Sequence, residues 1–313
     1  MKSPGIAFFG SPPLARNCLD ALLQHFQIRL VVTQPDRERG RGRRISITPV
    51  KALALEADLP LYQDENLGEP LVSEIQARGV ELVVVVAYGR ILPERIIYSP
   101  PLGCLNLHAS LLPKFRGASP IEAALLAGER ETGVTLQVMV PEMDRGDVIA
   151  SERIPIEDHW TAEHLAHEIA GRAPAFLVHS LKEYLSGRLS PVTQDEERAS
   201  YCSVIRKEDG RLNWNEPAER IRNRIRAYSI WPVAHTRLDQ KLLRIFNAAI
   251  PPVETGRSGV PGEILEADRQ RGIVVRTGEG AVSITDLQME NKRRMDFRTF
   301  VNGYRNLRGE LLE

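Results

Sequence analysis

Short apolar runs alternate with amphipathic stretches along the first third of the chain. Apolar residues fill 6–9 and 30–32 and nearly fill 81–89, which begins with Glu81, and these runs have the character of buried strands. Between the first two runs, apolar residues of 14–23 recur at helical spacing behind two prolines, and 50–59 forms a second helical stretch. Strands that alternate with helices predict an α/β domain with a Rossmann-like, mostly parallel sheet.

A polar pair interrupts the apolar pattern at residues 105–108. Leu105 and Leu107 alternate with Asn106 and His108, so a strand would place the two polar side chains on one face, about 7 Å apart. An amide donor can stabilise an oxyanion, and a neighbouring imidazole can move a proton. This pair therefore predicts acyl-transfer chemistry. The alternative is that His108 is a hydrogen-bonded structural residue and that Asn106 caps a turn.

The next elements lead from this pair to a carboxylate. A capping-box sequence begins a helix over 120–127, and the β-branched run 134–140 predicts a buried strand. The latter leads to Asp144. Because open α/β sheets carry their sites at the ends of neighbouring strands, we expect Asp144 to lie beside Asn106 and His108.

Three motifs of this region resemble those of the folate-dependent formyltransferases. They are Asn106-x-His108, Ser110-Leu111-Leu112-Pro113 and Asp144-x-Gly-Asp147. The resemblance implies that Asn106, His108 and Asp144 transfer a formyl group from 10-formyltetrahydrofolate to an amine. No metal is expected, since that formyl donor is already activated.

The sequence departs from the family pattern at two places. The family usually has Leu-Asp-Thr-Gly-Asp, whereas this chain has Met143-Asp144-Arg145-Gly-Asp147, and Phe115 stands where Trp is common. Arg145 places a charge beside the expected carboxylate. Asp147 is the alternative carboxylate, and Asp144 is favoured because it matches the family position.

The resemblance also predicts a folate-binding wall. In the family, the backbone after the strand at 81–89 holds the pterin ring, and the loop after His108 contributes to the same site. For any single residue, a simple strand-to-helix turn is the alternative. The expected cofactor-binding residues are Ala87, Tyr88, Gly89, Ile91, Leu92, Ser110, Leu111, Leu112 and Pro113.

A long segment without apolar pattern, 33–49, is rich in arginine and glycine. Long loops of this kind are usually functional or disordered, and arginine side chains pair well with phosphates. The alternative is a solvated loop. Thr33-Gln-Pro-Asp, Gly40-Arg41-Gly42 and Pro49-Val-Lys resemble the methionyl-tRNA formyltransferases, which implies that the loop enters the acceptor stem of initiator tRNA with Arg41 as its key residue. The expected tRNA-binding residues are Arg37, Arg39, Arg41, Arg43 and Arg44.

The last third of the chain has a different pattern. A polar stretch suggests a linker at 190–204 between a catalytic domain, 1–189, and a second domain, 205–313. Arginines alternate with apolar residues in a helix over 217–228, and Asp296 is placed to begin a last helix. The five short strands that follow predict a small OB-like β-barrel, and they are 234–238, 242–248, 262–267, 272–277 and 281–287. The Ile225–Pro232 run resembles the C-terminal, tRNA-binding domain of the same family.

Composition limits the remaining possibilities. The 313 residues are 42% hydrophobic and 26% charged, which is ordinary for a globular protein. Acidic and basic residues balance at 41 each, so any affinity for nucleic acid must come from local patches. The cysteines Cys18, Cys104 and Cys202 have no metal or disulfide spacing. Without a signal peptide or apolar span, we expect a cytoplasmic protein without membrane contact, and a monomer.

We therefore expect transfer of a formyl group from 10-formyltetrahydrofolate to methionyl initiator tRNA, for translation initiation. A formyltransferase acting on a small amine would explain Asn106, His108 and Asp144 but not the arginine loop. A non-catalytic nucleic-acid-binding protein would explain the loop but not the polar triad.

Overall fold

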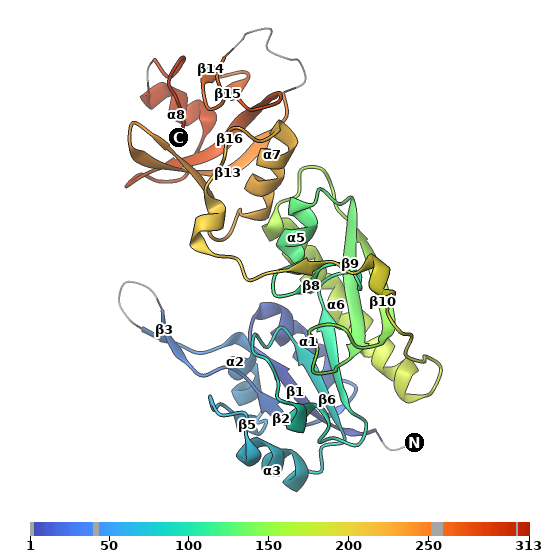
Figure 1. Cartoon of the computed structure of the whole chain (residues 1–313). Helices are drawn as coiled ribbons and strands as arrows, with labels where there is room; N and C mark the ends of the chain where they lie inside the picture. The colour runs from blue at the N-terminus through green and yellow to red at the C-terminus, as the bar shows by residue number, and fades with distance from the viewer. Residues whose placement is uncertain (1–2, 40–43, 252–258, 305) are drawn as a thin grey trace. The chain divides into compact units, whose positions relative to one another are not determined.

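The computed structural model describes residues 3–39, 44–251, 259–304 and 306–313 (Figure 1). The chain divides into two compact units. The first unit consists of Met1–Pro120, Glu131–Pro155 and His167–Cys202, and the second of Ile121–Arg130, Ile156–Ala166 and Ser203–Glu313. Of the linker suggested at 190–204, residues 190–202 thus belong to the first unit.

Within its described residues, the first unit is built on a seven-stranded sheet in the order β10-β9-β7-β6-β1-β2-β5. The pairs from β7 to β5 are parallel, whereas β9 is antiparallel to both β7 and β10. The predicted mostly parallel α/β fold is confirmed. The strands are β1 (Gly5–Gly10), β2 (Gln27–Val32), β5 (Leu61–Tyr62), β6 (Leu82–Val86), β7 (Cys104–His108), β9 (Glu131–Val138) and β10 (Val148–Pro155).

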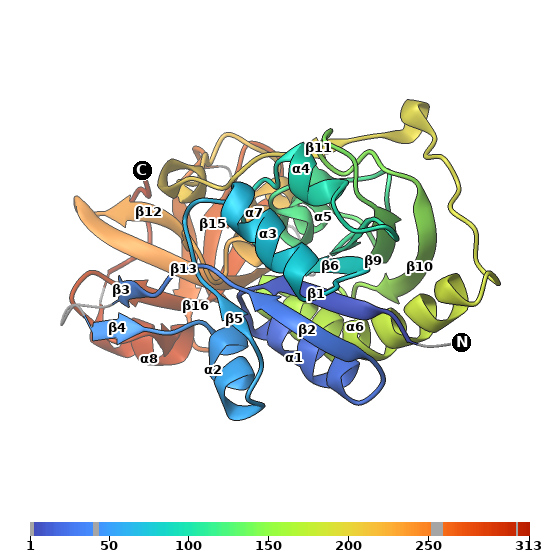
Figure 2. The same ribbon diagram turned by 90° about the horizontal axis from the view of Figure 1, so that it is seen from below.

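Helices cover both faces of this sheet (Figure 2). Helices α1 (Pro13–Leu23) and α2 (Pro49–Glu56) lie on one face, and α3 (Glu69–Ala77) and α4 (Glu94–Ile97) lie on the other. The face under α3 and α4 is apolar because alternate strand residues, such as Ala7 and Phe9, point into it. Two further helices are α5 (Pro120–Leu126) and α6 (Ala162–Leu185).

The arginine-rich loop contains regular structure that its sequence did not predict. Strands β3 (Arg37–Arg39) and β4 (Arg44–Ser46) pair antiparallel, so the expectation of a structureless loop is wrong for these residues. At its base, Lys51 Nζ lies 2.6 Å from Asp36 Oδ2, and Gln63 Nε2 donates to Asp36 Oδ1 at 3.0 Å. The start of the hairpin is thereby tied to α2.

The direction of β9 differs from the expectation drawn from its sequence. Gln137 lies opposite Asn106 and Thr135 opposite His108, so β9 runs against β7 and ends beside the beginning of that strand. An apolar run does not reveal strand direction. Asp144 is therefore not at the end of a parallel neighbour: it lies in the connection between β9 and β10.

The second unit contains a six-stranded antiparallel sheet among its described residues, with β12-β13-β16-β15-β14 in order and β17 paired to β16. The strands are β12 (Ala234–Leu238), β13 (Lys241–Ala249), β14 (Ile264–Asp268), β15 (Gly272–Arg276), β16 (Ala281–Met289) and β17 (Met295–Asp296). Glu313 exchanges two backbone hydrogen bonds with Arg237 of β12, and Ile264 of β14 donates to Glu310. These bonds link the two edge strands, in keeping with the predicted barrel.

Helices α7 (Ala218–Ala227) and α8 (Phe297–Gly303) complete this unit. The arginines of α7 are less available for binding nucleic acid than the sequence of this helix suggested. Arg222 binds Asp158, and Arg226 donates to the carbonyl of Trp160 at 2.6 Å, and both arginines are buried. Burial and the nearby charge of Arg222 lower the pKa of Arg226. Of the four arginines, Arg220 is the exposed one among the described residues.

Candidate functional site

The carboxylate of Asp144 is the point on which the predicted site residues converge. Its Oδ1 accepts hydrogen bonds from Gln137 Nε2 at 2.8 Å and from Asn106 Nδ2 at 3.4 Å. Its Oδ2 accepts one from the backbone N–H of Gly117 at 2.8 Å and lies 3.6 Å from His108 Nδ1. The structure thus brings Asn106, His108 and Asp144 together, through contacts from β7, β9 and the loop after β7.

The hydrogen bonding of His108 identifies the ring nitrogen that can accept a proton. His108 is buried, and its Nε2 lies 3.0 Å from the carbonyl oxygen of Phe115. Because a carbonyl only accepts, Nε2 must carry the hydrogen. Nδ1, which faces Asp144, is then the basic nitrogen of the neutral ring.

The loop after β7 is held in the conformation that these contacts need. Ser110 Oγ donates to the carbonyl of Lys114, and Thr135 of β9 donates to the carbonyl of Ser110. Phe115 has a φ of 59°, and Gly117 one of 123°. A side chain at Gly117 would place Cβ 2.1 Å from the carbonyl oxygen of Cys202. Glycine is therefore required where the backbone N–H reaches Asp144.

The unusual sequence around Asp144 leaves the contacts of its carboxylate intact. Arg145 forms an ion pair with Glu196 at 3.4 Å, and Met143 is exposed. Asp147 contributes its backbone carbonyl to the N–H of Val138. A Cβ at Gly146 would lie 1.7 Å from the carbonyl of Val138, which explains the glycine between the two aspartates.

The residues expected to form the folate wall divide into two groups. Tyr88 and Leu92 belong to the hydrophobic core, and Ser110 is buried. The others are partly or fully exposed, namely Ala87, Gly89, Ile91, Leu111, Leu112 and Pro113. The side chain of Ile91 is 78% exposed, so it offers apolar surface to solvent.

Three of the five arginines expected to bind tRNA lie within the described residues, in strands β3 and β4. Arg37 begins β3 and is exposed. Arg39 and Arg44 lie on the paired strands, and Arg41 and Arg43 fall outside the described residues.

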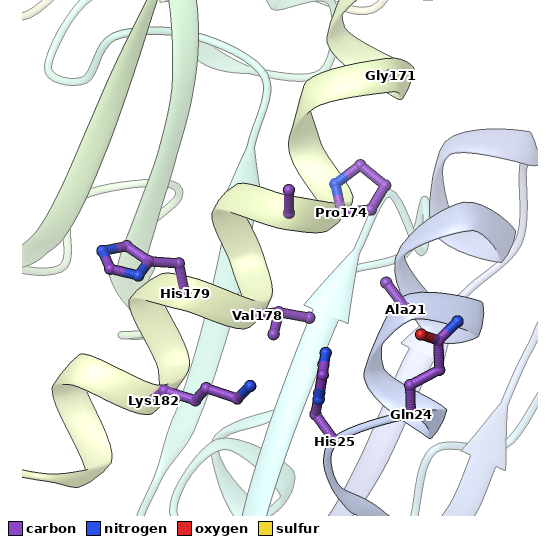
Figure 3. Close-up of a pocket in the computed structure, with 9 residues that line it drawn as sticks. Ala21, Gln24, His25, Gly171, Pro174, Val178, His179 and Lys182 are labelled. Atoms are coloured by element: carbon purple, nitrogen blue, oxygen red, sulfur yellow. The ribbon is translucent and has the colours of Figure 1, made fainter.

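A separate cavity of about 450 Å³ lies between α1 and α6. Figure 3 shows Gln24 and His25, at the end of α1, opposite Val178 and Lys182 of α6. Because α1 runs back from the carboxyl end of β1, the end of α1 lies near the opposite edge of the sheet. The cavity shares no lining residue with the site around Asp144, so the two are separate.

Several contributors to the site were missed from the sequence. Gln137 carried a usable signal, because it is a polar residue inside an apolar strand. Gly117 and Phe115 act through backbone groups, and the side chain of Gln194 reaches the site only through the folding of the chain, so no local pattern reveals them. Gln194 Nε2 donates to the carbonyl oxygens of Asp144 and Gly146.

Two further observations concern the described residues alone. Within them, no group of three or more His, Cys, Asp or Glu side chains is arranged to hold a metal ion. In the same part of the chain, none of the helices has both the length and the apolar character to cross a membrane.

Comparison with known proteins identifies the family of the chain. Residues 5–181 match the "Formyl transferase" family, and residues 204–305 match "Formyl transferase, C-terminal domain". The chain is 40% identical over 308 residues to a methionyl-tRNA formyltransferase of Carboxydothermus hydrogenoformans, covering 98% of this chain and 99% of that protein. It is 38% identical over 302 residues to the enzyme of that name from Staphylococcus aureus, with 96% of each chain covered.

A solved structure supports the fold. The sugar 3N-formyl transferase WlaRD, crystallised in the presence of dTDP and 5-N-formyl-THF, superposes with a TM-score of 0.69 at 18% identity, covering 94% of this chain and all of that one. The match of both family models in order, together with relatives similar over nearly their full length, places this chain in the methionyl-tRNA formyltransferase family of formyl transferases.

Proposed function

We propose that this protein transfers the formyl group of 10-formyltetrahydrofolate to the α-amino group of methionyl initiator tRNA. The convergence of Asn106 and His108 on Asp144 is the observation that carries the chemistry. The similarity to methionyl-tRNA formyltransferases over nearly the whole chain supports the choice of acceptor. We also propose that the protein is a monomer and acts in the cytoplasm.

The reaction joins the amine nitrogen to the formyl carbon and breaks the bond from that carbon to N10 of the folate. As the amine attacks, negative charge develops on the formyl oxygen. Asn106 Nδ2 has a second N–H besides the one directed at Asp144, and this N–H stabilises the oxyanion. His108 Nδ1 takes the proton that the amine loses, and the imidazolium returns it to the departing N10.

Asp144 acts on both of these partners. Its negative charge stabilises the His108 imidazolium, and its hydrogen bond orients the Asn106 amide. With Gln137 and the Gly117 N–H donating to it as well, the carboxylate is held in one position before substrate arrives. Such preorganisation avoids rearranging dipoles during the reaction.

The residues after β6 fit a folate. The pterin ring is planar and carries alternating donors and acceptors, which backbone groups recognise well. Ala87 and Gly89 are exposed with φ values of 45° and 77°. Gly89 lacks a Cβ, and one there would lie 2.7 Å from Gln34 Nε2. Exposed backbone and the exposed Ile91 together supply polar and apolar surface to the ring.

The acceptor tRNA is assigned to two basic regions. We propose that the β3–β4 hairpin, with Arg37, Arg39, Arg41, Arg43 and Arg44, grips phosphates of the acceptor stem. In this proposal residues 1–189 form the catalytic domain and residues 205–313 form a tRNA-binding domain. On the second unit, Arg220, Lys292 and Arg293 are exposed, and OB-like barrels commonly bind nucleic acid.

The test is formyl transfer measured with three acceptors: methionyl initiator tRNA, methionyl elongator tRNA and free methionine. We expect efficient transfer to the initiator tRNA alone. His108→Ala and Asn106→Ala should each lower kcat by about 10²- to 10³-fold and leave folate binding nearly unchanged. Transfer to a small amine in preference to tRNA would overturn the assigned acceptor, and near-normal turnover of either variant would overturn that residue's role.

A further inference from the structure

Residues 192–202 are bound along the loops that carry the site. Val192 and Val148 exchange two backbone hydrogen bonds of 2.8 Å. Further along, β11 (Tyr201–Cys202) pairs in parallel with β8 (Arg116–Gly117). Ser200 Oγ accepts from the N–H of Phe115 at 2.9 Å. This segment, here called the strap, therefore contacts both the loop after β7 and the connection after β9.

Arg116 is the anchor of the strap. Its side chain is fully buried, and each of its five N–H bonds has an acceptor. Nε and Nη2 donate to Gln194 Oε1 at 3.1 and 2.9 Å, and the other acceptors are Glu196 and the hydroxyl of Tyr201. A buried guanidinium with all its donors satisfied fixes its partners rigidly in place.

The side chain of Gln194 connects Arg116 to the backbone of Asp144. Since Arg116 can only donate, Oε1 of Gln194 must face it, and the amide nitrogen must face the other way. Its two N–H bonds reach the carbonyl oxygens of Asp144, at 2.8 Å, and of Gly146, at 2.6 Å. Asp144 has a φ of 53°, in the left-handed region that residues other than glycine adopt at some cost, although aspartate does so more often than most. The two hydrogen bonds from Gln194 hold the backbone in this conformation.

We propose that Gln194 is a positioning residue for formyl transfer, which holds the backbone of Asp144 so that its carboxylate meets Asn106 and His108. The inference rests on the proposed function of the site. It assigns a role in the reaction to the segment that leads to the second domain, outside the Asn106, His108 and Asp144 set. It requires a side chain that accepts from Arg116 and donates to two carbonyls at once, which glutamine does.

Gln194→Glu separates the two halves of this role. The variant keeps an oxygen facing Arg116 and adds an ion pair, but it has no N–H to donate to the carbonyls of Asp144 and Gly146. Turnover should fall by about 10- to 100-fold, while the KM for the folate donor stays close to that of the wild type. The thermal midpoint should fall, because a carboxylate oxygen then faces two carbonyl oxygens. Arg198→Ala is the matched control on the same segment, because that side chain is 79% exposed and pairs with Asp195. Its kinetics should be unchanged.

A double-mutant cycle with Asp144→Asn shows whether Gln194 acts through Asp144. If it does, adding Gln194→Glu to Asp144→Asn lowers kcat little further; multiplicative losses mean a general structural effect and overturn the proposal. Normal turnover of Gln194→Glu also overturns it. If Gln194→Glu does not fold, Gln194→Asn, which keeps the amide on a shorter side chain, is put through the same cycle. A wild-type protein that formylates none of the acceptors would instead refute the proposed function.

Discussion

Gln137 Nε2 and Asp144 Oδ1 lie 2.8 Å apart. Gln137 belongs to strand β9, and Asp144 lies in the connection that follows this strand. The amide of Gln137 is buried, and its Oε1 has no hydrogen-bond partner among the described residues. The same side chain thus serves the carboxylate and carries an unsatisfied buried oxygen.

Replacing Gln137 by Met should separate activity from stability. The variant loses one hydrogen bond to the carboxylate, which should lower kcat roughly tenfold. It also removes the unsatisfied Oε1, which offsets part of the cost of the lost hydrogen bond, so the thermal midpoint should change little. Steady-state kinetics and thermal unfolding of the variant check both statements. A fall in stability with normal turnover would show that Gln137 supports packing alone.

The two aspartates of the β9–β10 connection should differ sharply in importance. Asp144→Asn removes the charge on which the polar contacts converge and should lower kcat by about 10²-fold or more. Asp147→Asn should change it by less than about threefold, since the contact of Asp147 with Val138 runs through its backbone. Single-turnover transfer rates distinguish the two. The reverse order would reassign the carboxylate to Asp147.

Gly117 should tolerate no side chain. In Gly117→Ala, the new Cβ would meet the carbonyl of Cys202 at 2.1 Å and push the Gly117 N–H away from Asp144. We expect a loss of about 1–3 kcal/mol in the free energy of unfolding, with reduced kcat. Gly187→Ala is the control, because Gly187 also has positive φ, at 76°, but has open space around it. Equal effects of the two substitutions would mean that backbone strain, not the contact with Cys202, is responsible.

The thiols should react unequally. Burial raises the pKa of Cys18 to about 12, and it raises the pKa of Cys104 as well, so neither forms thiolate at neutral pH. Cys202 is partly exposed. A thiol reagent should therefore modify at most one cysteine rapidly in the native protein and all three after unfolding. Rapid native modification of Cys104 would contradict its burial.

The arginine hairpin should account for part of the salt dependence of tRNA binding. If Arg41 contacts a phosphate, Arg41→Ala should lower the slope of log affinity against log salt by about one unit or a little less, without affecting folate binding. Transfer kinetics over a salt series and a folate titration measure these effects. An unchanged slope would favour a solvated loop, and lost folate binding would favour a small-amine acceptor.

The expectation that Asn106, His108 and Asp144 lie together agrees with the structure, but part of the reasoning behind it was wrong. Asn106 and His108 share a face of β7, as their alternation with leucine indicated. Asp144 was expected at the end of a strand neighbouring β7, but β9 is antiparallel to β7 and ends beside the beginning of that strand. The chain returns to the site through the connection after β9, and hydrophobicity holds no information on such a return.

Elements with strong local patterns were predicted well. The five short strands after Pro232 are present, as are the helix over 217–228 and the one begun by Asp296, whose carboxylate caps Thr299. The short β3–β4 pairing was missed because Arg37–Arg39 and Arg44–Ser46 are only three residues each and show no alternation of apolar and polar positions. The burial of Arg222 was missed because its partner, Asp158, is distant in sequence.

The strap limits how freely this catalytic domain can be combined with others. Consider a recombination in evolution that joins a different second domain directly after α6. It would discard the strap, including Gln194, Ser200 and strand β11. The recombinant would retain Asn106, His108 and Asp144 but would lose contacts that shape their loops. Modular exchange in this architecture therefore has to take place beyond Cys202, and a lineage that acquired a different second domain would be expected to keep the strap.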